Sequence, residues 1–217
     1  MIFNNKKEKL YKNASKIALG NSQNIYNEAK LLIDEEYYAR GFALCVISLE
    51  ESAKSFLYRL ISLDLVYEDK TLQFVRRGYD AHKNKLQQSS LILSFSTKFL
   101  GVIIEFAKMA HEEGHIKEKF PLPNDYKERL EELVKLSERI AKFQSRKNDS
   151  LYVDVREGKI IDPNNMVKKE QALTMLEIVN MQTGIVKPFI YLDNAKFLAM
   201  WKEPLMSQLK IKELLKP

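Results

Sequence analysis

The segment from Tyr38 to Leu63, YARGFALCVISLEESAKSFLYRLISL, has a strong helical pattern. Apolar residues recur in it every three or four positions, which is the spacing of one face of an α-helix. That face consists of Phe42, Val46, Leu49, Ala53, Phe56 and Leu60. The other side carries Ser48, Ser52, Ser55 and Arg59. The segment therefore predicts a long amphipathic helix.

Two charged residues, Glu50 and Lys54, interrupt a second apolar stripe of the same segment. The rest of that stripe is Ala43, Ile47, Leu57 and Ile61. A Glu four residues before a Lys is a favourable helical pair, but a half-buried pair stabilises little against its desolvation cost. The placement predicts either a polar pocket or an ordinary salt bridge at the edge of the stripe.

Helical periodicity extends on both sides of this segment. It covers residues 6–33, 70–77, 81–110, 125–147, 166–185 and 188–215, and the first of these is one helix or two broken near Gly20. Residues 151–155 alternate like a short strand, and Glu157-Gly158 offers a turn to a second strand at 159–161. No repeat or linker divides the chain. The prediction is an all-α antiparallel helical bundle with a small β-hairpin insertion and C-terminal helices, as one domain over residues 1–217.

Composition narrows the class of protein. The 217 residues include only 7 Gly and 6 Pro, which favours long helices over tight turns. The single cysteine, Cys45, lies in an apolar run and predicts a buried thiol in a reducing compartment. No signal peptide opens the sequence, and Lys98 and Glu105 interrupt its most apolar segment, so we expect a cytoplasmic protein without a membrane span. A net charge of +6 permits nucleic-acid binding, but lysine-rich solvated helix faces give the same total.

The segment RRGYDAHKNK, residues 76–85, gathers four cations and one of three histidines. Gly78 and then Asp80 predict the end of one helix and the N-cap of the next. Cleavage of RNA needs a base for the 2′-hydroxyl and a cation for the charge that develops on the phosphorane. His82 suits the first role and Arg77 the second, while Lys83 and Lys85 would hold the RNA backbone. The alternative is a basic turn with a capping histidine.

Residues 111–115, His-Glu-Glu-Gly-His, match the HExxH pattern of zinc peptidases. Glu131 or Glu132 has the spacing of a third ligand. Gly114 would end the helix before a metal site is rigid, however, and Glu113 places a charge where such motifs have none. The alternative is a helix C-terminus, where His and Gly are both favourable. We therefore expect no metal here.

Three segments together resemble the AbiV-type abortive-infection proteins, a branch of the HEPN superfamily. Residues 39–54 are similar to the family's apolar helix with a Glu-Glu-x-x-Lys motif, here Glu50, Glu51 and Lys54. Residues 82–86 resemble its His-Lys-x-Lys-Leu segment. Residues 150–154, followed by Gly158 and Pro163, resemble its Gly-Leu-Tyr-Val-Asp region, with Ser150 in place of the first Gly. The likeness spans roughly residues 20–185.

The resemblance implies a HEPN-like core over about residues 20–148, a bundle that commonly dimerises, and a role in phage defence. It also implies metal-independent ribonuclease activity without a cofactor, with Arg77 and His82 as the catalytic pair and Arg76 as a second choice that otherwise binds RNA. Glu50, Glu51 and Lys54 would line one cleft, which Asp154 joins, and the His82 of a second copy would act as the acid. The alternative is a non-catalytic module that binds RNA, a nucleotide, or a phage or host protein.

Overall fold

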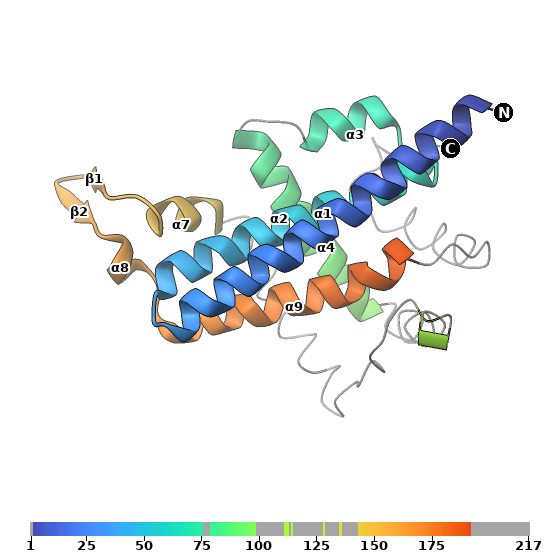
Figure 1. Cartoon of the computed structure of the whole chain (residues 1–217). Helices are drawn as coiled ribbons and strands as arrows, with labels where there is room; N and C mark the ends of the chain where they lie inside the picture. The colour runs from blue at the N-terminus through green and yellow to red at the C-terminus, as the bar shows by residue number, and fades with distance from the viewer. Residues whose placement is uncertain are drawn as a thin grey trace.

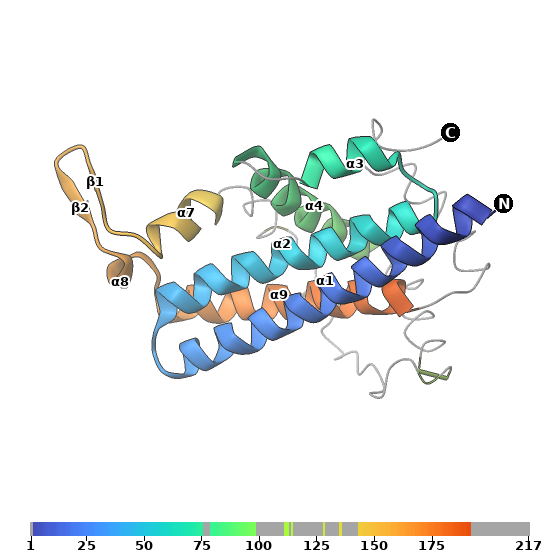
Figure 2. The same ribbon diagram turned by 45° about the horizontal axis from the view of Figure 1, so that its top comes forward.

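The chain folds into a bundle of helices from which one β-hairpin projects (Figures 1 and 2). The computed structural model describes residues 2–75, 79–98, 111–112, 114, 128, 135 and 143–191. Most of these residues are helical, and the strands form one two-stranded antiparallel sheet, which confirms the predicted fold class. The elements are α1 (Ile2–Asp34), α2 (Tyr38–Ser62), α3 (Glu68–Val75), α4 (Tyr79–Lys98), α7 (Phe143–Asp149), β1 (Asp154–Arg156), β2 (Lys159–Ile161), α8 (Pro163–Met166) and α9 (Lys169–Tyr191).

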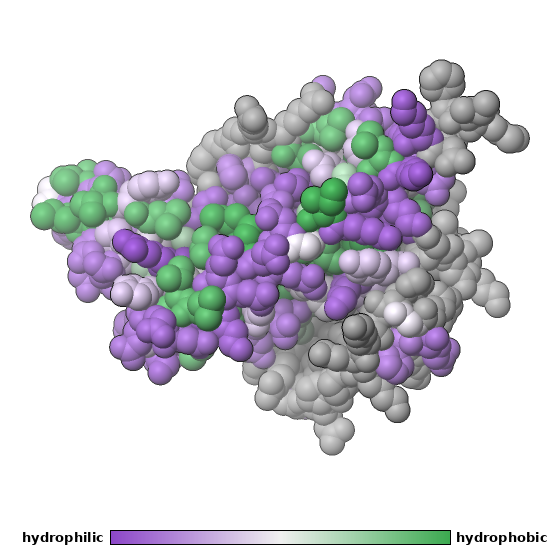
Figure 3. Space-filling view, in the orientation of Figure 1, coloured by the Kyte–Doolittle hydropathy of each residue, from purple (hydrophilic) through white to green (hydrophobic). Residues whose placement is uncertain are grey.

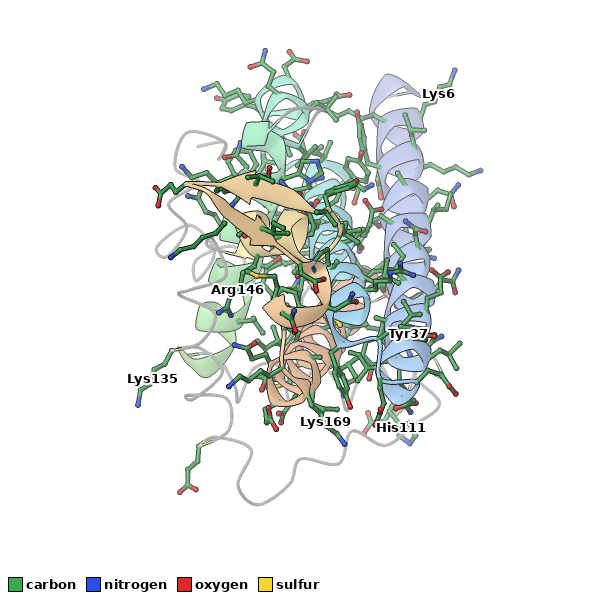
Figure 4. All side chains as sticks on the ribbon, turned by 90° about the vertical axis from the view of Figure 1, so that its left-hand side faces the viewer. Lys6, Tyr37, His111, Lys135, Arg146 and Lys169 are labelled. Atoms are coloured by element: carbon green, nitrogen blue, oxygen red, sulfur yellow. The ribbon has the colours of Figure 1, made fainter. Side chains whose placement is uncertain are left out.

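The predicted helix, α2, lies at the centre of the bundle. Figure 4 shows α1 on one side of it and α4 on the other, and α9 packs against both α1 and α2. The polar side of an amphipathic helix ordinarily faces solvent, but here that side is buried as deeply as the apolar one. Its members are Ser48, Ser52 and Ser55, each 0% exposed, and Arg59, which is 1% exposed. The serines lie against neighbouring helices, so these small hydroxyl residues serve packing instead of solvation.

Helix α1 runs without a break through Gly20 and packs antiparallel on α2. Serines join the two backbones. Ser22 Oγ donates to the Ser48 carbonyl at 2.9 Å, and Ser48 Oγ donates to the Ser22 carbonyl at 2.8 Å. Seven residues further along α2, Ser55 Oγ donates to the Ser15 carbonyl at 2.8 Å. Only small side chains allow a hydroxyl to reach the backbone of the neighbouring helix, so these serines fix a close approach of α1 and α2.

Both ends of this helical pair turn without a glycine. Glu36 has a φ of 65° after α1, and Asp64 has a φ of 56° after α2. The Tyr37 N–H donates to the Leu32 carbonyl at 2.8 Å, which is the long hydrogen bond of a Schellman motif. The same backbone geometry follows α2, where the sequence offers Asp64 for the left-handed position.

The chain changes direction between α3 and α4 (Figure 1). Residues 76–78, which join the two helices, lie outside the described residues. Asn84 Nδ2 donates to the Phe74 carbonyl at 3.2 Å and so ties the start of α4 to the end of α3. The prediction of Asp80 as N-cap was wrong, because α4 already includes Tyr79 and an N-cap residue precedes the first helical residue.

The predicted hairpin is confirmed at residues 154–161 and extends away from the bundle (Figure 2). Val155 pairs with Ile160, and the turn between the strands has positive φ at both Glu157 and Gly158, at 51° and 75°. Arg156 fastens the hairpin to α7, because its Nη2 lies 2.7 Å from Asp149 Oδ1. Apolar side chains remain exposed on the hairpin, where Figure 3 shows a green patch at the left.

Helix α9 continues through Pro188, where the sequence predicted a break between two helices. Burial of Val186, Phe189 and Ile190 in the main core favours the helical path on both sides of the proline. The carbonyl of Phe189 accepts a hydrogen bond from Arg59 Nε at 3.3 Å. The hydrophobic core therefore includes residues of α9 as well as of α1, α2 and α4.

Much of the predicted helices at 81–110, 125–147 and 188–215 lies outside the described residues. Within the part of the chain that is described, no helix has both the length and the apolar character that a membrane crossing needs.

Candidate functional site

The site is built around a buried carboxylate on the central helix. Glu50 is 2% exposed, and among the described residues three side chains contact its two oxygens. Oε2 lies 2.5 Å from His82 Nδ1 and 3.3 Å from Lys85 Nζ, and Oε1 lies 3.0 Å from Lys147 Nζ. We call these four residues the Glu50 cluster. It joins α2, α4 and α7, and its two lysine cations outnumber the one carboxylate.

Local sequence positions each member of the cluster. His82 and Lys85 are three residues apart, so they lie on the same face of α4 and reach one oxygen of Glu50 together. The carbonyl of Leu49 accepts hydrogen bonds from Ser89 Oγ at 3.2 Å and from Gln182 Nε2 at 3.1 Å. These bonds fix α4 and α9 to α2 directly beside Glu50.

His82 is the exposed member of the Glu50 cluster. Its side chain is 40% exposed, whereas those of Lys85 and Lys147 are 11% and 8% exposed. A carboxylate only accepts hydrogen bonds, so Nδ1 must carry the proton of the short contact. In the neutral ring this leaves Nε2 with a free lone pair. The arrangement therefore orients the His82 imidazole so that Nε2, which does not contact Glu50, is the nitrogen that can accept a proton.

Lys147 is the member that the sequence analysis missed. A signal was present, because Lys147 lies one helical turn after Phe143 and two turns after Ile140 on the apolar side of the segment at residues 125–147. A lysine at such a position needs a buried anion as partner. Glu50, on an apolar stripe of another helix, is that anion.

Glu51 and Lys54 do not share this cluster, although the sequence placed them in one cleft with Glu50. Lys54 Nζ lies 2.5 Å from Glu51 Oε1, and Asn21 Nδ2 of α1 donates to Glu51 Oε2 at 3.1 Å. Successive residues of a helix point about 100° apart, so Glu50 and Glu51 meet different neighbours. The Glu51–Lys54 pair replaces the predicted edge salt bridge between Glu50 and Lys54, and Glu50 instead has buried polar partners on other helices.

The proposed RNA contacts differ in exposure. Lys83 is exposed. Lys85 is buried against Glu50, whereas a residue that holds the RNA backbone must face solvent. Arg76 and Arg77 lie outside the described residues.

Asp154 lies on β1 and bonds with Arg156 and the Val155 N–H, so the structure does not bring it into the Glu50 cluster. The hydrogen bond from Arg156 lowers the pKa of the Asp154 carboxyl.

The HExxH segment contains the end of a helix. His111 and Glu112 are helical, Gly114 has a φ of 72°, and its N–H donates to the His111 carbonyl at 3.0 Å. This geometry matches the alternative of a helix C-terminus. Glu113, His115, Glu131 and Glu132 lie outside the described residues, and among those described no group of three or more potential ligands lies close enough to hold a metal ion.

Comparison with known proteins identifies the family. The family model described as AbiV, of the HEPN group, matches residues 10–182, which is most of the chain and includes the whole of the Glu50 cluster. No curated protein and no solved structure matches the chain. The match confirms the resemblance that residues 39–54, 82–86 and 150–154 carry. The chain belongs to the AbiV family of HEPN abortive-infection proteins.

Proposed function

We propose that this protein is a metal-independent endoribonuclease of phage defence, with His82 as its general base. The observation that carries the proposal is the 2.5 Å contact between His82 Nδ1 and Glu50 Oε2, made by a ring that is 40% exposed. A buried carboxylate that fixes one imidazole nitrogen and leaves the other to the solvent is how proteins prepare a histidine to accept a proton.

The reaction that suits this group is transfer of the phosphoryl group within the RNA chain. His82 Nε2 takes the proton of a 2′-hydroxyl, the O2′–P bond forms, and the P–O5′ bond breaks. The products are a 2′,3′-cyclic phosphate and a 5′-hydroxyl, whose oxygen takes a proton from water or from the His82 of a second copy. Lys83, which is exposed one residue further along α4, would hold the backbone. Arg77 stabilises the phosphorane in this proposal on the family resemblance alone.

Cleavage of RNA in EDTA tests the proposal. We expect the wild type to leave cyclic phosphate ends, identified by mass spectrometry, and His82→Ala to lower the rate by about 10²- to 10⁴-fold. His111→Ala is a matched control, because it removes another histidine outside the Glu50 cluster, and it should cleave like the wild type. Equal cleavage by the wild type and His82→Ala would refute the role of His82.

A second candidate function is RNA binding without cleavage, and the same short contact favours it. If both ring nitrogens are protonated, His82 forms an ion pair with Glu50 and its Nε2–H can donate to a phosphate but cannot accept a proton. Binding would then weaken steeply with salt, since each phosphate contact releases counterions. Tight salt-dependent binding with intact RNA, lost in His82→Ala and Lys83→Ala, would select this function over the nuclease.

A further inference from the structure

We infer that Arg156 of the hairpin is a positioning residue for His82, although it lies outside the Glu50 cluster. It acts through α7, which meets the hairpin at Asp149 and meets Glu50 at Lys147. The inference concerns the orientation of the His82 imidazole, and it rests on the proposed function only for its effect on RNA cleavage.

Helix α7 contacts the bundle and the hairpin with opposite sides. Lys147 and Asp149 are two residues apart, so their side chains point about 200° apart around the helix axis. Lys147 Nζ lies 3.0 Å from Glu50 Oε1, and Asp149 Oδ1 lies 2.7 Å from Arg156 Nη2. Figures 1 and 2 show α7 between the hairpin and the bundle. The helix therefore has one ion pair toward the bundle and another toward the hairpin.

Two carboxylates hold the guanidinium of Arg156. Its Nη2 contacts Asp149, and its Nε lies 2.7 Å from Oδ2 of Asp154 on the same strand. A guanidinium is a rigid planar fork, so two such contacts fix its place as well as satisfying its charge. The side chain is 51% exposed, and exposed ion pairs contribute little to stability. A bridge with defined geometry and little energetic value indicates a role in positioning α7.

The hairpin is anchored to the bundle at its other end, so it can hold α7 in place. Strand β2 leads into α8, where the side chain of the N-cap residue Asp162 accepts a hydrogen bond from the Asn164 N–H at 3.0 Å. Val167, directly after α8, is 4% exposed and belongs to the hydrophobic core. The Arg156 bridge therefore ties the C-terminal end of α7 to an element that is also fixed through α8.

Lys147 fixes which oxygen of Glu50 faces His82. Lys147 contacts Oε1, whereas His82 and Lys85 contact Oε2. The terminal torsion of a glutamate is broad and roughly two-fold, so a carboxylate without a partner on Oε1 could turn and offer either oxygen to Lys85. With α7 in place the carboxylate has one orientation, and the imidazole that it holds keeps Nε2 available to accept a proton.

RNA cleavage kinetics together with thermal melting test the role of Arg156. We expect Arg156→Gln to lower kcat about 10- to 100-fold with KM unchanged, because a misplaced catalytic group slows the reaction without removing contacts to the substrate. Its melting temperature should stay that of the wild type, since the ion pair is exposed. Asp154→Asn is the matched control: it removes the bond of Arg156 within the hairpin, keeps the one to α7, and should cleave like the wild type.

A double-mutant cycle tests the route through α7. Lys147→Met should also lower kcat, and adding Arg156→Gln should cause no further loss, because both changes release the same carboxylate. The exchange of Asp149→Arg with Arg156→Asp keeps one cation and one anion between the two elements, so it should restore the rate that either change alone lowers. Losses that multiply in the double variant would mean that Arg156 does not act through Lys147, and they would overturn the inference.

The NMR signals of the His82 imidazole give a readout that needs no cleavage. The chain has three histidines, so ¹⁵N labelling gives three imidazoles, and the signals missing in His82→Ala belong to His82. Arg156→Gln should shift or broaden the Nδ1 signal, and Asp154→Asn should leave it unchanged. If the wild type leaves RNA intact but Arg156→Gln still changes the signal, the nuclease fails and the positioning of His82 stands. An unchanged Nδ1 signal in Arg156→Gln, or the same change in Asp154→Asn, would overturn the inference even in a chain that cleaves RNA.

Discussion

The two sides of α2 bury polar groups in different ways. On the side of α1, Ser22 and Ser48 exchange hydroxyl hydrogen bonds at 2.8–2.9 Å and introduce no charge. On the side of α4 and α7, Glu50 holds a histidine and two lysines in the interior. Neutral hydroxyls let two helices pack closely at little cost, but ions must be desolvated, and apolar residues of similar volume often stabilise as well or better. The hydroxyls on the α1 side therefore serve the fold, whereas the buried charges on the α4 side indicate a functional role.

Glu50→Gln should have the largest effect on the free energy of unfolding. It leaves the cations of Lys85 and Lys147 buried without a counter-charge, and breaking a buried ion pair from one side costs about 3–5 kcal/mol. Lys147→Met is the matched variant. It keeps Glu50 paired with Lys85 and His82 and should cost less than half as much. Guanidinium denaturation followed by circular dichroism measures both, and equal losses would show that charge balance does not govern the cluster.

Gly41→Ala should have the next largest effect, on the opposite side of α2. A Cβ at Gly41 would meet Cγ1 of Ile33 in α1 and would lie 3.0 Å from the carbonyl oxygen of Ala29. Overpacking of this kind costs about 1–3 kcal/mol. Ile33→Ala removes the first of these atoms. The loss of stability in the double variant should therefore be smaller than the sum of the losses in the two single variants. Strict additivity would mean that the close approach of α1 and α2 does not limit stability.

Sequence could predict the α2 helix, the hairpin and the family, because each rests on local pattern. The apolar periodicity of residues 38–63 predicts the α2 helix, and the turn residues Glu157 and Gly158 predict the hairpin. Sequence also marked Glu50 as anomalous on an apolar stripe. Its neighbours were harder to predict, because Lys147 is 97 residues away and reaches Glu50 only through the packing of α7.

Errors arose where packing opposed a local rule. The serines and Arg59 of α2 look like a solvent-facing side, but α1 and α9 cover them. Pro188 is a signal for a helix end, but α9 continues because apolar residues on both sides of it are buried. Glu50 and Glu51 are adjacent in one motif, yet they belong to different interfaces. A family motif therefore gives the residues of a site without giving the direction in which each one points.

The smallest effect is expected from Cys45, a group on α2 that is 0% exposed. Burial raises the pKa of its thiol from 9.0 to about 12. Well below pH 9 both the folded and the unfolded chain keep the proton, so the thiol has no effect there on the pH dependence of stability.

As the pH rises from 9 toward 12, the unfolded thiol ionises and the folded one does not, so the folded state loses about 1.4 kcal/mol by pH 10 relative to neutral pH. Cys45→Ala should remove that part of the alkaline decline while other titrations remain. Urea denaturation of both proteins at pH 7 and pH 10 measures the difference, and the native thiol should resist alkylation at both values, because only the thiolate reacts. A decline of the same size in both proteins would show that the interior beside α1 tolerates a charge. The environment of Cys45 would then tolerate a buried charge as the environment of Glu50 does, although the neighbouring hydroxyl pair of Ser22 and Ser48 is neutral.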